Sequence, residues 1–158
     1  MTRCLADTER DGYRERLLAY DSPEGGAVTA YLLTPPGAGP VPGVVVEHQH
    51  ASQWHLGKSE PAGLAGDPLQ AFGPALARRG IVVLAPDAIG FEDRRQGASG
   101  TEPGSRDREQ HVQLMISLLL HDRLLMTVVL RDAMAAGRGT RCRSRRRRAR
   151  TARPRSGR

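Results

Sequence analysis

The sequence lacks the cysteine pattern of a disulfide-bonded or zinc-binding protein. It contains two cysteines, Cys4 and Cys142, which lie near opposite ends of the chain and have no metal-ligand spacing. Two cysteines so far apart make no disulfide framework, and their low number is typical of a reducing compartment. We therefore expect a cytoplasmic protein.

The sequence also lacks a long hydrophobic run. Residues 1–7 lead into charged positions without the apolar segment of a secretory signal. The most apolar window, residues 112–130, is interrupted by His121, Asp122 and Arg123. Three polar residues in mid-span argue against a transmembrane helix, so we expect no membrane partner.

Charge is distributed unevenly along the chain. Residues 138–158 contain 11 arginines and no acidic residue, so residues 1–137 contain 13 basic and 17 acidic side chains and are mildly acidic. From residue 137 onward there is no hydrophobic periodicity and almost no apolar side chain. This composition predicts a disordered basic tail over residues 137–158, able to contact polyanions nonspecifically through phosphate groups.

Two segments near the N-terminus predict a β-hairpin. Residues 15–20 and 27–33 are separated by the turn-forming sequence Asp-Ser-Pro-Glu-Gly-Gly at positions 21–26. Residues 1–12 precede this hairpin and are interpreted as an N-terminal lead.

Two short apolar runs, residues 44–46 and 81–85, predict strands that are buried on both faces, as in parallel sheets. Between them, Asp67 as N-cap and Pro68 predict the start of a helix that ends at Gly80. Apolar residues at helical spacing support it, at Leu69, Phe72, Leu76 and Ala77. The strand–helix–strand order predicts a βαβ unit with parallel strands.

A long second helix is predicted from Asp107 to Ala136, with an apolar stripe over residues 112–124. This length is unusual for a globular domain, so the polar residues 121–123 are interpreted as a break. Such a stripe most often belongs to the core, although it can also bind a partner.

The order of hairpin, buried strand, helix, buried strand and long helix is that of the first half of an α/β-hydrolase. Three stretches carry a closer resemblance: PGVVVEHQH at 42–50, GKSE at 57–60 and RGIVVLAPDAIGF at 79–91. They resemble the dienelactone hydrolase and acetyl xylan esterase-like branch of that fold, over residues 13–136. The resemblance implies an α/β fold with a partial hydrolase sheet. It also implies a parent activity of hydrolysing a small carboxylic ester or related substrate.

The resemblance further implies which residues shape the site. In the family, the loop after the residue 44–46 strand forms the oxyanion hole, so Gln49 or His50 would supply a backbone N–H and His48 would orient the loop. The loop around Asp87 would line the mouth of the pocket. Independently of the family, open α/β sheets bind ligands at the carboxyl ends of their strands, where both loops begin. No cofactor is implied.

The sequence departs from the family in its catalytic residues. The family requires a Gly-x-Ser-x-Gly elbow followed by an acid and a histidine, and no serine of this chain lies in such an elbow. Ser59 comes closest, but Pro61 replaces the second glycine. We therefore expect a truncated hydrolase with pocket residues but no nucleophile, acid or catalytic histidine, and hence no activity.

The truncation leads to two further expectations. The tail is rich in Arg, Ala, Pro, Gly and Ser, which out-of-frame reading of a GC-rich gene tends to produce, so a frame shift near Gly137 is a hypothesis. The missing strands are expected to extend the sheet beyond the residue 81–85 strand. Without them, an apolar strand edge and the helix stripe would be exposed. Nothing in the sequence predicts the oligomeric state.

Three alternative interpretations concern the same loops. His48, His50 and His55 are candidate metal ligands, but alternating side chains share a metal only where the chain turns, so loop shaping is favoured. Gly57-Lys58-Ser59 is similar to the end of a phosphate-binding loop, but Ser52 stands where that motif needs glycine. The acids near the mouth are expected to be solvated or to shape turns, with Asp87 the strongest candidate for chemistry; the others are Glu47, Glu92 and Asp93.

The alternative function is that of a protein which binds nucleic acid or another polyanion through its arginine tail. The tail contains four consecutive arginines at 145–148 but no aromatic residue for base stacking. Sequence-specific readout is therefore not expected.

Overall fold

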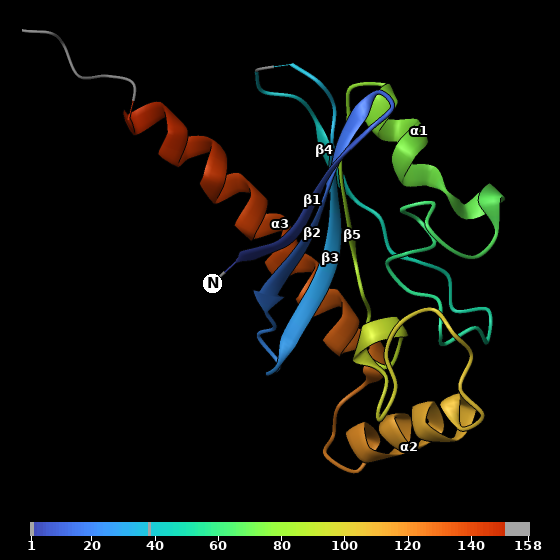
Figure 1. The fold of residues 1–158 in the computed structure, drawn as a ribbon. Helices are drawn as coiled ribbons and strands as arrows, with labels where there is room; N and C mark the ends of the chain where they lie inside the picture. Colours follow the sequence, from blue (N-terminus) through green and yellow to red (C-terminus); the bar gives the residue numbers. More distant parts are fainter. Residues whose placement is uncertain (1, 38, 151–158) are drawn as a thin grey trace, which may run out of the picture.

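The computed structural model describes residues 2–37 and 39–150, and the side chains of all these except residues 138–150. Its centre is a five-stranded sheet in the order β1-β2-β3-β5-β4. The strands are β1 (Arg3–Arg10), β2 (Tyr13–Asp21), β3 (Ala27–Thr34), β4 (Gly43–Val45) and β5 (Val82–Pro86). Helices lie on both faces, with α1 on one side of the sheet and α3 on the other (Figure 1). The fold class is therefore α/β, as predicted.

The predicted hairpin and the predicted parallel pair are both present. β2 and β3 pair antiparallel from Arg14↔Thr34 to Asp21↔Ala27, around the turn predicted at residues 21–26. β4 and β5 pair in parallel, with Gly43 opposite Val82. The hairpin joins the parallel pair through β3, which is antiparallel to β5.

Two predictions about the edges of the sheet are wrong. Residues 1–12 are not a lead outside the sheet, because Arg3–Arg10 form β1, which pairs antiparallel with β2. Every residue of β1 is exposed, so the strand has no buried apolar face to reveal it in the sequence. The sheet also cannot extend beyond the residue 81–85 strand, because β5 lies between β3 and β4. The free edge on that side belongs to β4.

The predicted first helix is divided into a 3-10 turn, η1 (Pro68–Gln70), and α1 (Phe72–Arg78). Asp67 caps η1 as predicted, with its carboxylate accepting from the N–H of Leu69 at 2.9 Å. However, Leu69 is 81% exposed and Phe72 48% exposed, so neither belongs to the core. The change from 3-10 to α geometry breaks the single apolar face that the spacing predicted.

The predicted second helix is divided where the polar residues indicated. α2 spans Asp107–Leu119 and α3 spans Leu125–Arg150, and Asp122 between them has a φ of +54°. The backbone of α3 continues past residue 137, where the sequence predicted disorder. Arginine and alanine have high helix propensity, so this segment can be helical without burying an apolar face. The rest of the predicted tail, residues 151–158, lies outside the described residues.

Two hydrophobic clusters pack against opposite faces of the sheet. One includes Leu84 of β5 and Ala136 of α3, and the other includes Val83 of β5 and Ala77 of α1. Neighbouring residues of β5 thus point to opposite faces, as expected for a strand buried between two helical layers. Within the described part of the chain, no helix is long and apolar enough to cross a bilayer.

Polar contacts also fix α3 to the sheet. The buried carboxylate of Asp132 accepts hydrogen bonds from Oγ of Ser22, at 2.5 Å, and from the guanidinium of Arg94, at 2.8 Å. Ser22 begins the β2–β3 turn, and Arg94 follows β5. Asp132 therefore holds α3 against two connections of the sheet at once.

Candidate functional site

The loops after β4 and β5 meet at one end of the sheet, because parallel strands end on the same side. The N–H of Ala88 donates a hydrogen bond to Nε2 of His48 at 3.2 Å. Nδ1 of His48 lies 2.9 Å from the carbonyl oxygen of Gln49. Since Nε2 accepts, Nδ1 carries the proton, and His48 is a neutral imidazole. Burial lowers the pKa of His48, which favours this neutral form.

Gln49 and His50 follow His48 and are anchored by their side chains. The amide of Gln49 donates to Oε1 of Glu60 at 2.9 Å, and Nε2 of His50 lies 3.1 Å from Nε2 of His111 in α2. The backbone N–H groups of Gln49 and His50 make no hydrogen bond with any other described residue. Two backbone donors thus lie beyond the carboxyl end of β4 without an acceptor in the described part of the chain.

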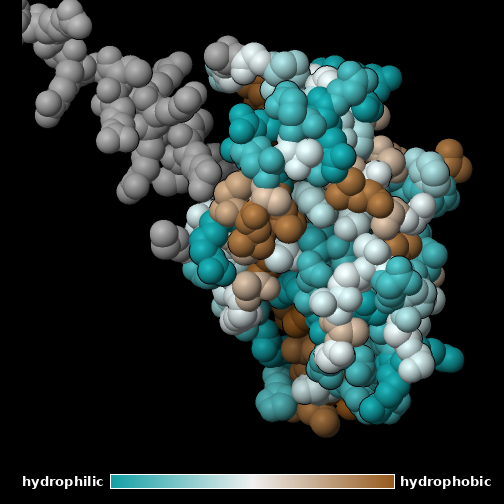
Figure 2. All heavy atoms as spheres, in the orientation of Figure 1, coloured by the Kyte–Doolittle hydropathy of each residue, from teal (hydrophilic) through white to brown (hydrophobic). Residues whose placement is uncertain are grey.

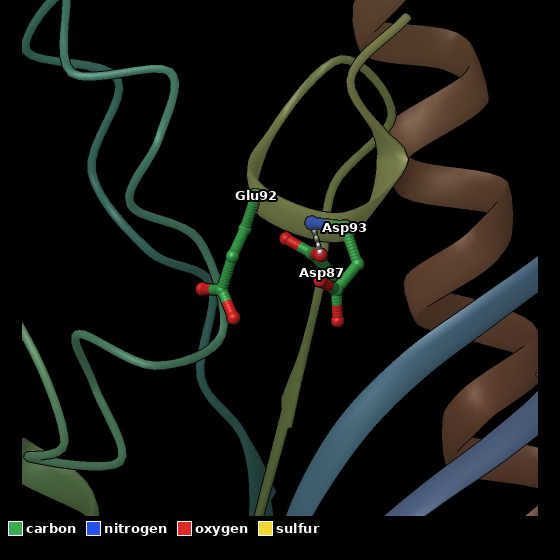
Figure 3. A group of neighbouring side chains, drawn as sticks. All are labelled: Asp87, Glu92 and Asp93. Carbon is green, nitrogen blue, oxygen red and sulfur yellow. Dashed lines mark hydrogen bonds between the residues drawn. The ribbon is translucent and has the colours of Figure 1, made fainter. Parts of the chain in front are cut away.

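Beside this loop, three carboxylates surround one ammonium group. Figure 3 shows the side chains of Asp87, Glu92 and Asp93 close together. One oxygen of each carboxylate lies within 4.8 Å of the other two. Nζ of Lys58 lies 2.5 Å from Glu92, 2.6 Å from Asp93 and 3.4 Å from Asp87. Lys58, Asp87 and Glu92 are almost completely buried. The position that a cation would occupy among these acids is therefore filled by the lysine.

Burial and charge shift the pKa values in this cluster in different directions. Burial raises the pKa of Asp87 to about 7, although the nearby Lys58 opposes this change. Burial alone would lower the pKa of Lys58, but the carboxylates of Asp87 and Glu92 raise it above its ordinary value. The ammonium group therefore stays charged at neutral pH, while Asp87 titrates near neutrality.

Glu92 connects the two segments that form the cluster. It begins the 3-10 turn η2 (Glu92–Arg94) and has a φ of +37°, a region that residues with side chains rarely adopt. Its carboxylate accepts from the N–H of Gly57 at 3.0 Å, the N–H of Ser59 at 2.9 Å and Oγ of Ser59 at 2.6 Å. These bonds, together with that from Lys58, hold Glu92 in its strained conformation.

Gly57 is required by the close approach of the two segments. A Cβ atom at this position would lie 2.0 Å from Oδ1 of Asp87 and 3.0 Å from Cβ of Glu92. No side chain fits in that space. The Gly57-Lys58-Ser59 sequence is therefore a packing and ion-pairing element.

Aromatic rings and histidines join α2 to the same loops. The ring of His111 lies 5.0 Å from that of His50, 5.2 Å from that of Phe91 and 5.8 Å from that of Trp54, measured between centroids. His111 is 3% exposed. The buried ion pair between Arg95 and Asp107, at 2.6 Å, fixes the start of the same helix.

The structure bears on the alternative interpretations of these loops, and it corrects the one that expected solvated acids. Lys58 cannot act as a phosphate-binding lysine, because its ammonium group is buried among carboxylates. Glu92 is buried and not solvated. Glu47 lies at the surface, but partial burial of its carboxyl group raises its pKa to about 7, so it is not fully solvated either. Among the described residues, the one group with metal-ligand spacing is the acidic one, and His48, His50 and His55 form no such group.

The structure shows no activated nucleophile among the side chains it describes. Ser59 is 4% exposed, and its hydroxyl donates to the carboxylate of Glu92. No described serine hydroxyl is hydrogen-bonded to a histidine. In the described residues, the arrangement offers backbone donors and a rigid frame, but it lacks the hydroxyl–imidazole pair that acyl transfer requires.

Sequence reasoning missed the roles of Lys58 and His111. Lys58 is the chain's one lysine among 23 arginines, and this exception was a usable signal. A compact ammonium fits between three carboxylates where a planar guanidinium does not. His111 lies 61 residues from its partner His50 and carries no local pattern, so only the tertiary fold reveals the pair.

The arrangement of sheet, helices and carboxyl-end loops is an α/β fold that also forms part of a larger solved structure. No protein-family model and no curated protein sequence matches the chain. Among solved structures, it is similar to a provisionally assigned acetyl xylan esterase from Bacteroides fragilis, with a TM-score of 0.63 and 17% sequence identity. The match covers 85% of this chain and 36% of that protein, so this chain spans little more than a third of its length. At this identity the likeness concerns the fold alone.

Proposed function

We propose that residues 13–136 form the N-terminal part of a serine-type α/β-hydrolase that acts on carboxylic esters or related small substrates. The observation that carries the proposal is the pair of backbone N–H groups at Gln49 and His50. They lie beyond the carboxyl end of β4 and have no acceptor among the described residues. The fold shared with an esterase-like protein supports the same class.

In this proposal the two N–H groups form part of an oxyanion hole. Attack on an ester carbonyl produces a tetrahedral intermediate with a negative oxygen, which fixed backbone donors stabilise. The hydrogen bond from Ala88 to His48 fixes the start of this loop relative to β5. The ion cluster of Lys58 and Glu92 fixes the neighbouring wall, so the donors are held in place before a substrate binds.

The chain is proposed to be inactive by itself, because its sequence contains no Gly-x-Ser-x-Gly elbow. Without a nucleophile, the oxyanion donors have no intermediate to stabilise. We expect no turnover of nitrophenyl acetate above the rate in buffer. Turnover that a serine-directed phosphonate abolishes would contradict this part of the proposal.

The oxyanion role has its own test, in which methylphosphonate mimics the tetrahedral anion. The amide resonances of Gln49 and His50 are followed by NMR during titration at 0.3 M salt, which screens weak contacts with the arginine tail. We expect shifts at these two amides, and smaller shifts in the variant His48→Ala. If the shifts are confined to arginine side chains, the assignment of the oxyanion loop is wrong.

A second candidate function is supported by charge. The 11 arginines of residues 138–158, set against a mildly acidic remainder, suit nonspecific binding of nucleic acid or another polyanion. Retention of the full chain on DNA at 0.15 M salt, lost when residues 145–148 are changed to glutamine, would favour it. If the unchanged chain is already released from DNA at a salt concentration below 0.15 M, this second function is excluded.

A further inference from the structure

α2 lies across the carboxyl-end side of the sheet, at the bottom of the view in Figure 1. It is held against the loops there and not against the sheet itself. Its buried residues are Asp107, His111 and Leu118, and two of these three have titratable side chains. Four of its large apolar residues face outward instead, at Val112, Met115, Ile116 and Leu119, whereas Leu114 is half-buried beside Gly90. Apolar side chains accordingly reach the surface at the lower end of the molecule (Figure 2). Ionisable contacts therefore share with Leu114 and Leu118 in holding α2 in place.

The central contact is the hydrogen bond between Nε2 of His50 and Nε2 of His111, at 3.1 Å. One of these nitrogens must carry a proton and the other must accept it. A single added proton preserves the bond, because an imidazolium can donate to a neutral imidazole. When both rings are protonated, each presents an N–H to the other and the bond is lost. Two positive charges then also face each other at short range.

The other ring nitrogen of His111 is enclosed while α2 is docked. Nδ1 of His111 is buried, and the group beside it is the backbone of Gly90, which favours a proton there. Burial opposes the positive charge that a second proton would bring, and so does the neighbouring His50, so the pKa of His111 is lowered despite Gly90.

The charged groups around the pair do not compensate for a second proton. Asp107 is the nearest acid on α2, and its carboxylate is already paired with Arg95 at 2.6 Å. On the loop side, His48 is neutral and packs on Phe91, and Glu92 is bound by Lys58. The buried carboxylate of Glu60, also near this loop, accepts from the side-chain amide of Gln49 at 2.9 Å. These three carboxylates are therefore already engaged by other groups.

We propose that α2 is a pH-released cover over the His48–His50 loop, held closed by the His50–His111 hydrogen bond. The sign of the effect follows from linkage. The closed state binds fewer protons than the open one, so closure is complete above the ordinary histidine pKa of about 6.5 and is lost as the pH falls below it. Opening removes the ring of His111 from His50, which is exposed already, and thereby widens access to the half-buried residues His48 and Gln49. The opening itself does not depend on the hydrolase proposal. Its functional meaning, access of substrate to the oxyanion loop, does.

The chain provides its own probe for this opening. Trp54 is the one tryptophan in the sequence, and its ring lies 5.8 Å from that of His111. We expect its fluorescence to change between pH 7.5 and pH 5, with a midpoint below 6.5. The change should be absent in His111→Gln, which cannot take up the proton, and preserved in the matched control His55→Gln. Identical titration curves for the unchanged chain and His111→Gln would overturn the proposal.

Hydrogen exchange of the unchanged chain separates local opening from unfolding and does not depend on any variant. After correction for intrinsic exchange rates, the protection of amides at 112–119 should fall by up to about tenfold for each pH unit below the transition, if one proton is taken up. Amides of β5 should keep their protection over the same range. Equal loss of protection in α2 and β5 would mean global unfolding, and would also overturn the proposal. Neither measurement involves ester chemistry, so the cover and the hydrolase assignment can fail independently.

Discussion

Nζ of Lys58 lies 2.5 Å from Oε1 of Glu92, and the two side chains are only 1% and 3% exposed. This contact joins the segment after the His48 loop to the 3-10 turn after β5. It also neutralises charge at a buried position, where water cannot solvate it. Its contribution to stability can therefore be measured by removing one partner.

Replacement of the lysine, as in Lys58→Met, is expected to destabilise the fold by about 3–5 kcal/mol, because it leaves a buried cluster of carboxylates without a counter-charge. The free energy of unfolding is measured by urea titration. The matched control is Arg106→Met, which breaks the exposed ion pair with Glu109. That change should leave the free energy of unfolding almost unchanged, because solvent screens an exposed ion pair. Equal effects of the two changes would show that the buried cluster has no special role.

The substitution Gly57→Ala tests the close approach between the two segments. Its Cβ atom would overlap with Oδ1 of Asp87, so we expect a loss of about 1–3 kcal/mol from overpacking. The matched control is Gly137→Ala in α3, where an added Cβ atom meets nothing within 4 Å. This control should be stabilising by up to about 1 kcal/mol, because alanine favours helix. If Gly57→Ala proves neutral, the two segments are not in the contact described.

The raised pKa of Asp87 predicts a characteristic pH dependence. Its value of about 7 in the fold lies above the ordinary value of 3.8, so folding favours the protonated form. The contribution of Asp87 to stability is therefore largest below pH 3.8 and is lost as the pH rises to about 7.

The comparison with Asp87→Asn isolates this contribution. Asparagine does not titrate, and the contributions of all other titratable groups are the same in both proteins and cancel in the difference. The stability of the unchanged chain relative to this variant should fall between pH 4 and pH 7, by at most about 4 kcal/mol. Urea titrations at four pH values measure it. A relative stability that is constant, or that rises with pH, would mean that Asp87 is fully ionised in the fold.

The sequence predicted those parts of the fold that have a local signal. The turn residues at 21–26 predicted the hairpin, and the valine-rich runs predicted the parallel pair. The polar residues 121–123 predicted the break between α2 and α3. β1 was missed because its residues are all exposed and its stability comes from pairing with β2. The order of β4 and β5 in the sheet was also missed, because strand order is a property of long-range contacts.

The candidate site was only partly predictable, for a similar reason. His48 and Asp87 follow buried strands, and this position alone places them at the carboxyl end of the sheet. The ion cluster depends on Lys58 and Glu92, which are 34 residues apart and meet only in the folded chain. Whether an acidic side chain is solvated or buried depends on what covers it, and the sequence around Glu92 does not show this.

The strand order has a consequence for the way this chain folds during synthesis. β1, β2 and β3 are consecutive hairpin strands, so they can pair as soon as Thr34 has left the ribosome. β4 follows at Gly43–Val45, but its one partner in the described sheet is β5, which ends at Pro86. Some forty residues must therefore be made before β4 has a strand to bind. During that interval its valines are available to chaperones, and its pairing waits, like that of β3 with β5, until β5 has been made.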